Sequence, residues 1–222
     1  MTYVKEIFQR LKESIPIPET ELYYINPYTL LVAVVLSAQS TDKGVNKATK
    51  SLFQIVQTPE AMLDLGLEAL KSSIKTIGLF NNKASNIIKL SQQLVEQYHG
   101  DVPSNRNDLM TLAGVGRKTA NVVLNIAYGQ PTIPVDTHVA QVAQRLNLSS
   151  STHPDKIEAD LEKIIPIDFL KDAHHLLILH GRYTCTARKP KCEHCVLNDL
   201  CPFFKRMAYP AGFEPTTFTS GG

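Results

Sequence analysis

The chain has 222 residues, 43% of them hydrophobic, and a formal net charge of +2, values typical of a globular protein with one or two compact domains. No apolar run approaches the roughly 18 residues that span a bilayer, and residues 1–14 mix charges into a helical pattern unlike that of a signal sequence. A membrane protein is therefore excluded, and we expect a cytoplasmic bacterial protein.

Apolar residues recur at intervals of three and four along most of the chain, and no segment shows the alternation of a strand. We therefore expect an all-α protein. Helices are predicted around residues 4–14, 28–38, 45–56, 59–65, 67–74, 83–98, 105–112, 116–128, 137–146, 153–165 and 167–179. Gly78 to Asn81 is predicted to form a tight turn, and residues 207–222, which lack periodicity, a disordered tail.

Charge is distributed unevenly, although its sum is small. Residues 109–135 contain no Asp or Glu, and residues 181–192 hold four basic side chains and no acid. The net charge does not indicate nucleic-acid binding. A basic surface for nucleic acid would therefore have to come from the uneven distribution of the charges.

Two glycines one residue apart, Gly114 and Gly116, separate the helix predicted at 105–112 from the longer one at 116–128. Glycines let a backbone turn sharply, and the N–H groups that begin a helix point at whatever lies in front of it, such as a phosphate. From the pattern alone, a helix–helix turn without a ligand is an equally good interpretation.

Lys118 falls in the first turn of the second helix, where the positive end of the helix dipole and Arg117 both disfavour a charged ammonium. A neutral amine can form a Schiff base, whereas a lone lysine is usually a solvated surface residue. Residues 129–135 can stretch about 23 Å, longer than the roughly 15 Å of helix before them, so Asp136 is able to return to Lys118. Its carboxylate can stabilise positive charge on a sugar, cap the next helix, or do both.

All four cysteines lie within 17 residues near the C-terminus: Cys185, Cys192, Cys195 and Cys201. In a reducing compartment such a group indicates a metal site, and four thiolates suit either a tetrahedral zinc ion or a cubane cluster. A disulfide framework is a weaker alternative. Between the first two cysteines runs a basic loop, residues 186–191, whose side chains are well placed for phosphate contact.

These motifs resemble those of one known family. The segment 112–138 resembles the helix-hairpin-helix, the Gly/Pro-rich loop and the aspartate of the endonuclease III family; the matching residues are Gly114, Gly116, Lys118 and Val135-Asp136-Thr137-His138. The resemblance extends from about residue 1 to 206 and includes Ser37 to Asp42 and His180 to Cys185. The cysteine spacing is that of the family's [4Fe–4S] loop, which favours a cluster over zinc.

The resemblance implies a two-lobed, all-α helix-hairpin-helix glycosylase architecture with a C-terminal iron–sulfur loop. Residues 20–130 are expected to form a helical barrel, and residues 1–19 with 131–206 a cluster domain, with DNA in the cleft between them. Two departures are notable. Ala113 stands where a proline is usual and is expected to loosen the hairpin slightly, and Gln141 stands where an arginine is common and is expected to remove a phosphate contact.

The implied activity is that of a bifunctional DNA glycosylase and AP lyase in base-excision repair. Lys118 is expected to be the catalytic amine and Asp136 the catalytic carboxylate, while the four cysteines hold a [4Fe–4S] cluster without a redox step. The base must leave the stack to be reached, so Leu79 is expected to be the wedge and Gln39 to fill the gap. The residues expected to contact DNA are Gln39, Leu79, Gly114, Gly116, His138, Arg188, Lys189 and Lys191.

The expected partner is double-stranded DNA that contains damaged pyrimidines or abasic sites, bound by a monomer at the bacterial nucleoid. Two other functions are open to the same residues. An adenine glycosylase of the same superfamily usually lacks the lysine and carries a further C-terminal domain, unlike this chain. A non-catalytic DNA-binding module would use the hairpin and the cluster only to hold duplex, and substitution of Lys118 distinguishes it from an enzyme.

Overall fold

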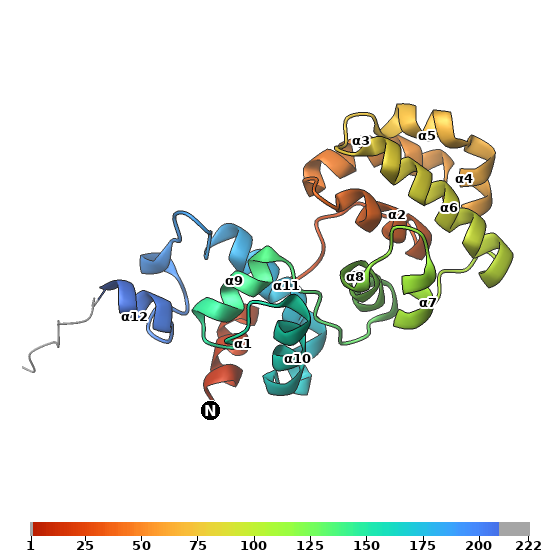
Figure 1. Ribbon diagram of the computed structural model, residues 1–222. Coiled ribbons are helices and arrows are strands. Elements are labelled where there is room, and N and C mark those ends of the chain that lie inside the picture. The colour runs from red at the N-terminus through yellow and green to blue at the C-terminus, as the bar shows by residue number, and fades with distance from the viewer. Residues whose placement is uncertain (1, 209–222) are drawn as a thin grey trace, which may run out of the picture. The chain divides into compact units, whose positions relative to one another are not determined.

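The computed structural model describes residues 2–208, which contain helices and no strand (Figure 1). The prediction of an all-α protein is confirmed. The helices are α1 (Tyr3–Ser14), α2 (Pro27–Ser37), α3 (Asp42–Ile55), α4 (Pro59–Leu65), α5 (Leu67–Ile74), α6 (Phe80–Tyr98), α7 (Arg106–Thr111), α8 (Arg117–Tyr128), α9 (Thr137–Arg145), α10 (Pro154–Ile164), α11 (Ile167–Tyr183), the 3-10 helix η1 (Cys192–His194) and α12 (Pro202–Ala208).

Polar side chains determine where several helices begin. Before α2, the Asn26 side chain accepts a hydrogen bond from the Thr29 N–H while Thr29 Oγ1 accepts one from the Asn26 N–H. Thr41, Thr58 and Asn105 likewise accept from the N–H three residues ahead, at the starts of α3, α4 and α7. Each cap satisfies a backbone donor that the first helical turn leaves without a partner.

The chain divides into two compact units. Residues Glu19–Pro134 form one, called here the hairpin unit, and Met1–Pro18 with Val135–Gly222 form the other, called here the cysteine unit.

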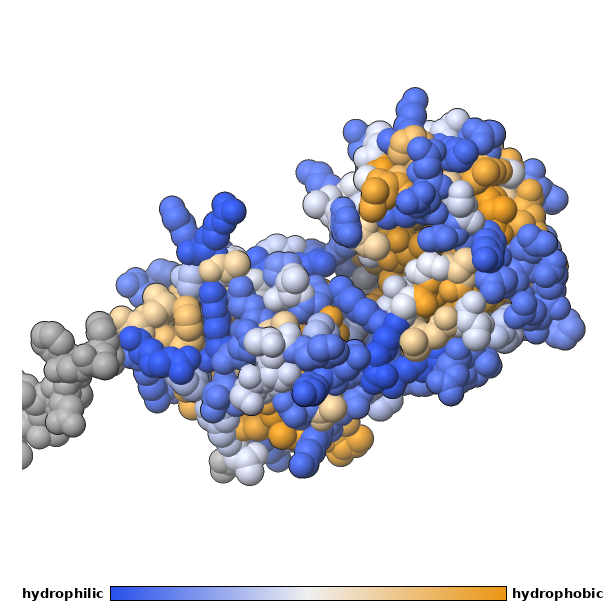
Figure 2. All heavy atoms as spheres, viewed as in Figure 1, coloured by the Kyte–Doolittle hydropathy of each residue, from blue (hydrophilic) through white to orange (hydrophobic). Residues whose placement is uncertain are grey.

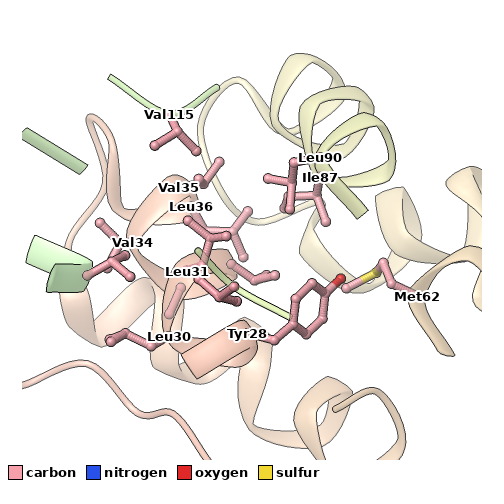
Figure 3. Packing of buried hydrophobic residues seen from close by; sticks show 14 of the residues in the cluster. Tyr28, Leu30, Leu31, Val34, Val35, Leu36, Met62, Ile87, Leu90 and Val115 are labelled. Carbon is pink, nitrogen blue, oxygen red and sulfur yellow. The ribbon is translucent and has the colours of Figure 1, made fainter. Parts of the chain in front are cut away.

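The hairpin unit is built around α2. Every side chain from Tyr28 to Leu36 is buried, so this helix packs on all sides and not along a single stripe. Helices α3, α6 and α8 pack directly against it. Figure 3 shows Leu36 and its neighbours in the same apolar cluster as Ile87 and Leu90 of α6. The core thus fixes the ends of α2 and α6, from which two of the predicted DNA contacts project.

The cysteine unit combines the N-terminal helix α1 with the helices from α9 to α12. Helix α1 packs on α11, where the Phe8 and Phe169 rings lie 6.0 Å apart between centroids. Helix α9 crosses α11 closely, and on the visible face of this unit hydrophilic side chains predominate (Figure 2). The crossing orients the end of α11, which leads directly into the cysteine-bearing segment.

The structure differs from the predicted elements in several places: α3 begins at Asp42, three residues before the predicted start, and η1 at Cys192–His194 was not predicted. Helix α6 begins at Phe80, so the tight turn predicted to run to Asn81 is shorter; α11 continues to Tyr183; and α12 was not predicted. Met207 and Ala208 belong to α12, so the prediction of disorder is wrong for these two residues. The remainder of the predicted tail, residues 209–222, lies outside the described residues. Within residues 2–208 no helix is both long and apolar enough to cross a membrane.

Gly181→Ala is expected to destabilise the cysteine unit. A Cβ at this buried position of α11 would lie 2.9 Å from His138 Cβ and 3.1 Å from the His138 carbonyl oxygen, so α9 and α11 would have to separate. Overpacking of this kind costs about 1–3 kcal/mol. Thermal unfolding followed by circular dichroism measures the loss. Gly78→Ala is the matched control because its Cβ meets nothing closer than 4.0 Å, and an equal fall in melting temperature for both variants would contradict the prediction.

Candidate functional site

The turn between α7 and α8 depends on its first glycine. Gly114 has φ of 77°, a conformation that side chains rarely adopt, and a Cβ there would lie 3.0 Å from the Asn86 side chain. Gly116 is the N-cap of α8; it is exposed, no side chain caps the helix, and open space surrounds its Cα. Ala113, which replaces the usual proline, donates its N–H to Gln93 Oε1 at 2.8 Å, a bond that proline cannot make. This bond ties the hairpin to α6.

Lys118 is the second residue of α8, and its side chain is exposed. The buried face of the helix begins at Ala120, so the lysine lies outside the apolar core of the hairpin unit. The first turn of α8 contains no acidic residue. An amine held on a rigid helix start, beside uncapped N–H groups, can approach a phosphate-bearing ligand.

Asp136 belongs to the cysteine unit and is the N-cap of α9. Its Oδ1 accepts a hydrogen bond from the Val139 N–H at 2.8 Å, which confirms the predicted capping role. Oδ2 accepts no hydrogen bond from the described residues, so one carboxylate oxygen remains available. His138, the second residue of α9 and partly buried, packs with its Cβ and carbonyl against Gly181.

Gln39 and Leu79 project from neighbouring loops of the hairpin unit, and both have left-handed backbones, with φ of 55° and 59°. Leu79 is 59% exposed, although leucine is among the residues that most often lie inside. The loops are adjacent, because a Cβ on Gly78 would lie 4.0 Å from the Gln39 carbonyl oxygen. Two exposed side chains on strained backbone, held side by side, are typical of residues with a functional constraint.

All four cysteines line one cavity of the cysteine unit, and its other walls are mostly apolar. Nitrogen donors approach the sulfurs: Arg145 Nη1 lies 3.3 Å from Cys185 Sγ, and the Leu197 N–H lies 3.4 Å from Cys195 Sγ. His180 Nε2 lies 3.7 Å from the same Cys195 sulfur. Burial raises the pKa of the Cys185 and Cys195 thiols, and N–H donors oppose it. Among the described residues no group of three or more side chains is arranged to hold a single metal ion, whereas four thiols around one apolar cavity, with N–H donors near two of them, fit a larger iron–sulfur cluster.

Arg145, the last residue of α9, supports the loop between the first two cysteines. Its guanidinium donates to the carbonyl oxygens of Cys185, Thr186 and Ala187 at 3.2, 2.9 and 3.0 Å, and lies 4.4 Å above the centre of the Phe203 ring. The side chains of Arg188, Lys189 and Lys191 on this loop are exposed. The loop backbone is thus fixed while its basic side chains face solvent.

Gln141, one turn before Arg145, donates its amide to the Cys185 carbonyl oxygen. The residue that differs from the family pattern therefore supports the cysteine segment in this chain. Arg145 was not among the sequence-predicted site residues. The available signal was its position four residues after Gln141, on the same helical face.

Comparison with known proteins agrees with this geometry. Residues 32–167 match the HhH-GPD superfamily base excision DNA repair protein model, and residues 185–201 match the iron-sulfur binding domain of endonuclease III. The chain is 57% identical to endonuclease III of Haemophilus influenzae over 204 residues, which cover 92% of this chain and 97% of the relative. The Escherichia coli K12 enzyme is 53% identical, over 91% and 96% of the two chains. The chain belongs to the endonuclease III family.

Solved structures give the same result. A trapped endonuclease III–DNA covalent intermediate matches with a TM-score of 0.87 and 43% identity, covering 94% of this chain and all of the other. A non-covalent endonuclease III–DNA complex has the same TM-score and 44% identity, with the same coverage of both chains. The predicted helix-hairpin-helix glycosylase fold is thereby confirmed. This member of the endonuclease III family is a DNA-binding base-excision repair enzyme, a DNA glycosylase and AP lyase that carries a [4Fe–4S] cluster, so zinc is excluded.

Arg145→Met is expected to destabilise the cysteine unit by about 2 kcal/mol, because three loop carbonyls and one cysteine sulfur lose a charged donor. The purified variant should carry less cluster per chain, measured by visible absorbance and iron content, and should melt at a lower temperature. Arg188→Met is the matched control, since it removes a basic side chain from the same loop but leaves the carbonyl contacts intact. Normal cluster content and melting temperature in Arg145→Met would contradict the prediction.

Proposed function

We propose that this member of the endonuclease III family removes oxidised pyrimidines from duplex DNA through the Lys118 amine and then cleaves the strand 3′ to the resulting site. The observation that carries the proposal is the exposed Lys118 at the uncapped start of α8, directly after the Gly114–Gly116 turn. A relative of the same fold has been trapped as a covalent intermediate with DNA, and such an intermediate requires a nucleophile on the protein.

The neutral Lys118 amine attacks C1′ of the damaged nucleotide. As the C1′–N bond to lysine forms, the glycosidic bond breaks, and the base leaves with the electron pair and takes up a proton. The nitrogen lone pair then expels O4′ from C1′, O4′ takes up a proton, and the ring-opened sugar is a protonated Schiff base on Lys118. Loss of a C2′ proton then expels the 3′ phosphate by β-elimination, because the iminium accepts the electrons.

Asp136 would assist the first step. Oδ1 is occupied by the Val139 N–H, so the carboxylate has a fixed orientation, and Oδ2 remains to face positive charge that develops on the sugar. Carboxylates perform this role in glycoside cleavage. His138, in the first turn of the helix that Asp136 caps, would contact the DNA backbone.

Leu79 and Gln39 would hold the damaged base outside the stack, Leu79 as the wedge and Gln39 in the gap left behind. Their exposure and their adjacent loops in the hairpin unit support these roles. Unstacking costs a few kcal/mol. Because the base must leave the stack before C1′ can be attacked, the two side chains act before any chemistry takes place.

Phosphate contacts would come from two places. In the hairpin unit, backbone N–H groups at Gly114 and Gly116 suit a phosphate at the start of α8. In the cysteine unit, Arg188, Lys189 and Lys191 stand on a loop already ordered by Arg145, which reduces the entropy lost on binding.

The ligands of the cluster would be Cys185, Cys192, Cys195 and Cys201, and the group supplies structural support without a redox step in base removal. In domain terms, we propose a helical barrel from residues 20–130 and a cluster domain from residues 1–19 and 131–206. The enzyme would act as a monomer on chromosomal DNA at the bacterial nucleoid, at damaged pyrimidines and at abasic sites.

Borohydride trapping tests the proposal. The purified, cluster-loaded protein is mixed with a duplex that contains one thymine glycol, and an undamaged duplex serves as the control. A covalent adduct on the damaged duplex alone, with release of the free base, is the expected result. Base release without an adduct would contradict the lysine mechanism. If neither the adduct nor the free base were formed, DNA binding would be the only activity left to this site.

A further inference from the structure

Lys83 is a buried lysine in the hairpin unit, with 5% of its surface exposed. It lies in the first turn of α6, and its ammonium donates to the Leu36 carbonyl oxygen and to Ser40 Oγ, both at 2.9 Å. No carboxylate among the described residues bonds to it, and burial lowers the pKa of the amine. A buried cation held only by neutral oxygens is costly, so a purely packing role would be served better by an apolar side chain.

The two acceptors of Lys83 mark the place where α2 ends. Leu36 lies in the last turn of α2, within the core shown in Figure 3, and its carbonyl is one that a helix end leaves without an intrahelical partner. The last turn of α2 contains no basic residue of its own. Lys83 therefore supplies, from another helix, the cation that a helix C-terminus favours.

The same lysine contacts both loops that carry the proposed inserting residues. Ser40 directly follows Gln39, so the hydrogen bond from Lys83 Nζ to Ser40 Oγ holds the loop that carries Gln39. The Leu79 loop is joined to the same helical turn, because the backbone N–H of Lys83 makes the ordinary i→i−4 bond to the Leu79 carbonyl oxygen at 3.1 Å; only the side-chain bonds on the Gln39 side are specific to lysine. Gln39 and Leu79 have φ of 55° and 59°, a left-handed backbone that persists only when surrounding structure determines it.

We propose that Lys83 is a positioning residue that fixes Gln39 and Leu79 relative to one another, so that both can enter the DNA stack together. The inference rests on the proposed inserting roles of those two residues. It follows that Lys83 matters for extruding a stacked base and much less for the lyase step at an abasic site, where no base has to be extruded.

The test uses Lys83→Met in the full, cluster-loaded chain under single-turnover conditions. Base release from a thymine glycol duplex is expected to fall about tenfold, while strand cleavage at a preformed abasic site changes by less than about threefold. Ser40→Ala, which removes one acceptor and leaves the lysine in place, should give a smaller loss with the same pattern. It keeps the test decisive if Lys83→Met does not fold. Equal losses on the two substrates would overturn the proposal, because they would indicate a general structural defect.

A double-mutant cycle with Leu79→Ala distinguishes the positioning role of Lys83 from the proposed inserting roles of Gln39 and Leu79, on which it rests. If Lys83 acts through the inserting residues, Lys83→Met should have little further effect on base release once Leu79 is truncated. An undiminished effect would overturn the positioning role. If Gln39→Ala and Leu79→Ala both leave base release unchanged, the inserting roles themselves are wrong, and any defect of Lys83→Met then belongs to the fold.

Discussion

Replacing Lys118 by methionine should abolish the covalent adduct and reduce strand cleavage by about 10⁴-fold or more, the size of effect expected when a nucleophile is removed. Methionine has a similar stem and similar helix propensity, and the side chain of Lys118 is exposed, so the melting temperature should stay within about 1–2 °C of the original. A large loss of activity without a loss of stability would assign the amine to the chemistry.

Lys118→Arg sharpens this experiment. Arginine keeps a basic side chain at the start of α8 but is never deprotonated in proteins, so it cannot form a Schiff base. We expect this variant to bind damaged duplex with nearly unchanged affinity and to give no adduct with borohydride. Lys89→Met, at another exposed lysine of the hairpin unit, should retain full activity. An adduct from Lys118→Arg would show that a different amine is the nucleophile.

Local signals in the sequence were enough for most of the helices. Helices α4 and α5 begin and end at the predicted residues, because Thr58 caps one and Gly66, with φ of 78°, separates them. The first turn of α6 was not predictable in this way. Its N-cap is Leu79 in a left-handed conformation, which local propensity disfavours for a leucine.

Helix α12 shows the same limit at the end of the chain. It spans only seven residues, too few for a clear period, and two of its aromatic side chains, Phe203 and Phe204, line the cavity of the cysteines. Its position depends on that cavity and on the contact of Phe203 with Arg145. A helix this short, which packs against the cavity of the cysteines, therefore cannot be predicted from the periodicity of apolar residues alone.

In the candidate site, too, some features could be predicted from the sequence and others could not. The spacing of the glycines and cysteines and the cap at Asp136 could be predicted, because each depends on residues close in sequence or on a familiar motif. The roles of Lys83 and Arg145 could not, since their partners lie about 40 residues or more away. A signal existed for Lys83: it occupies the buried stripe of α6 that continues at Ile87, where a lysine is unexpected.

Asp136→Asn and Asp136→Ala should give different stabilities but similar losses of activity. Asparagine is as good an N-cap as aspartate, so the Val139 N–H keeps its partner and the free energy of unfolding should change by only a few tenths of a kcal/mol. Alanine removes the cap, and its variant should be less stable by about 1 kcal/mol. Thermal unfolding of both proteins measures the difference.

Base release from thymine glycol should fall about 10²- to 10³-fold in both variants, because both remove the negative charge that we propose to face the sugar as the base departs. The comparison separates the two roles of one side chain. If Asp136 were only a helix cap, Asp136→Asn would keep its activity and only Asp136→Ala would lose some, in proportion to its stability. Thr58→Ala, which removes the corresponding cap of α4, is the matched control: it should lower the melting temperature about as much as Asp136→Ala does and leave base release nearly unchanged. Low activity in the stable Asp136→Asn variant would therefore locate the defect in the carboxylate charge and not in the start of α9.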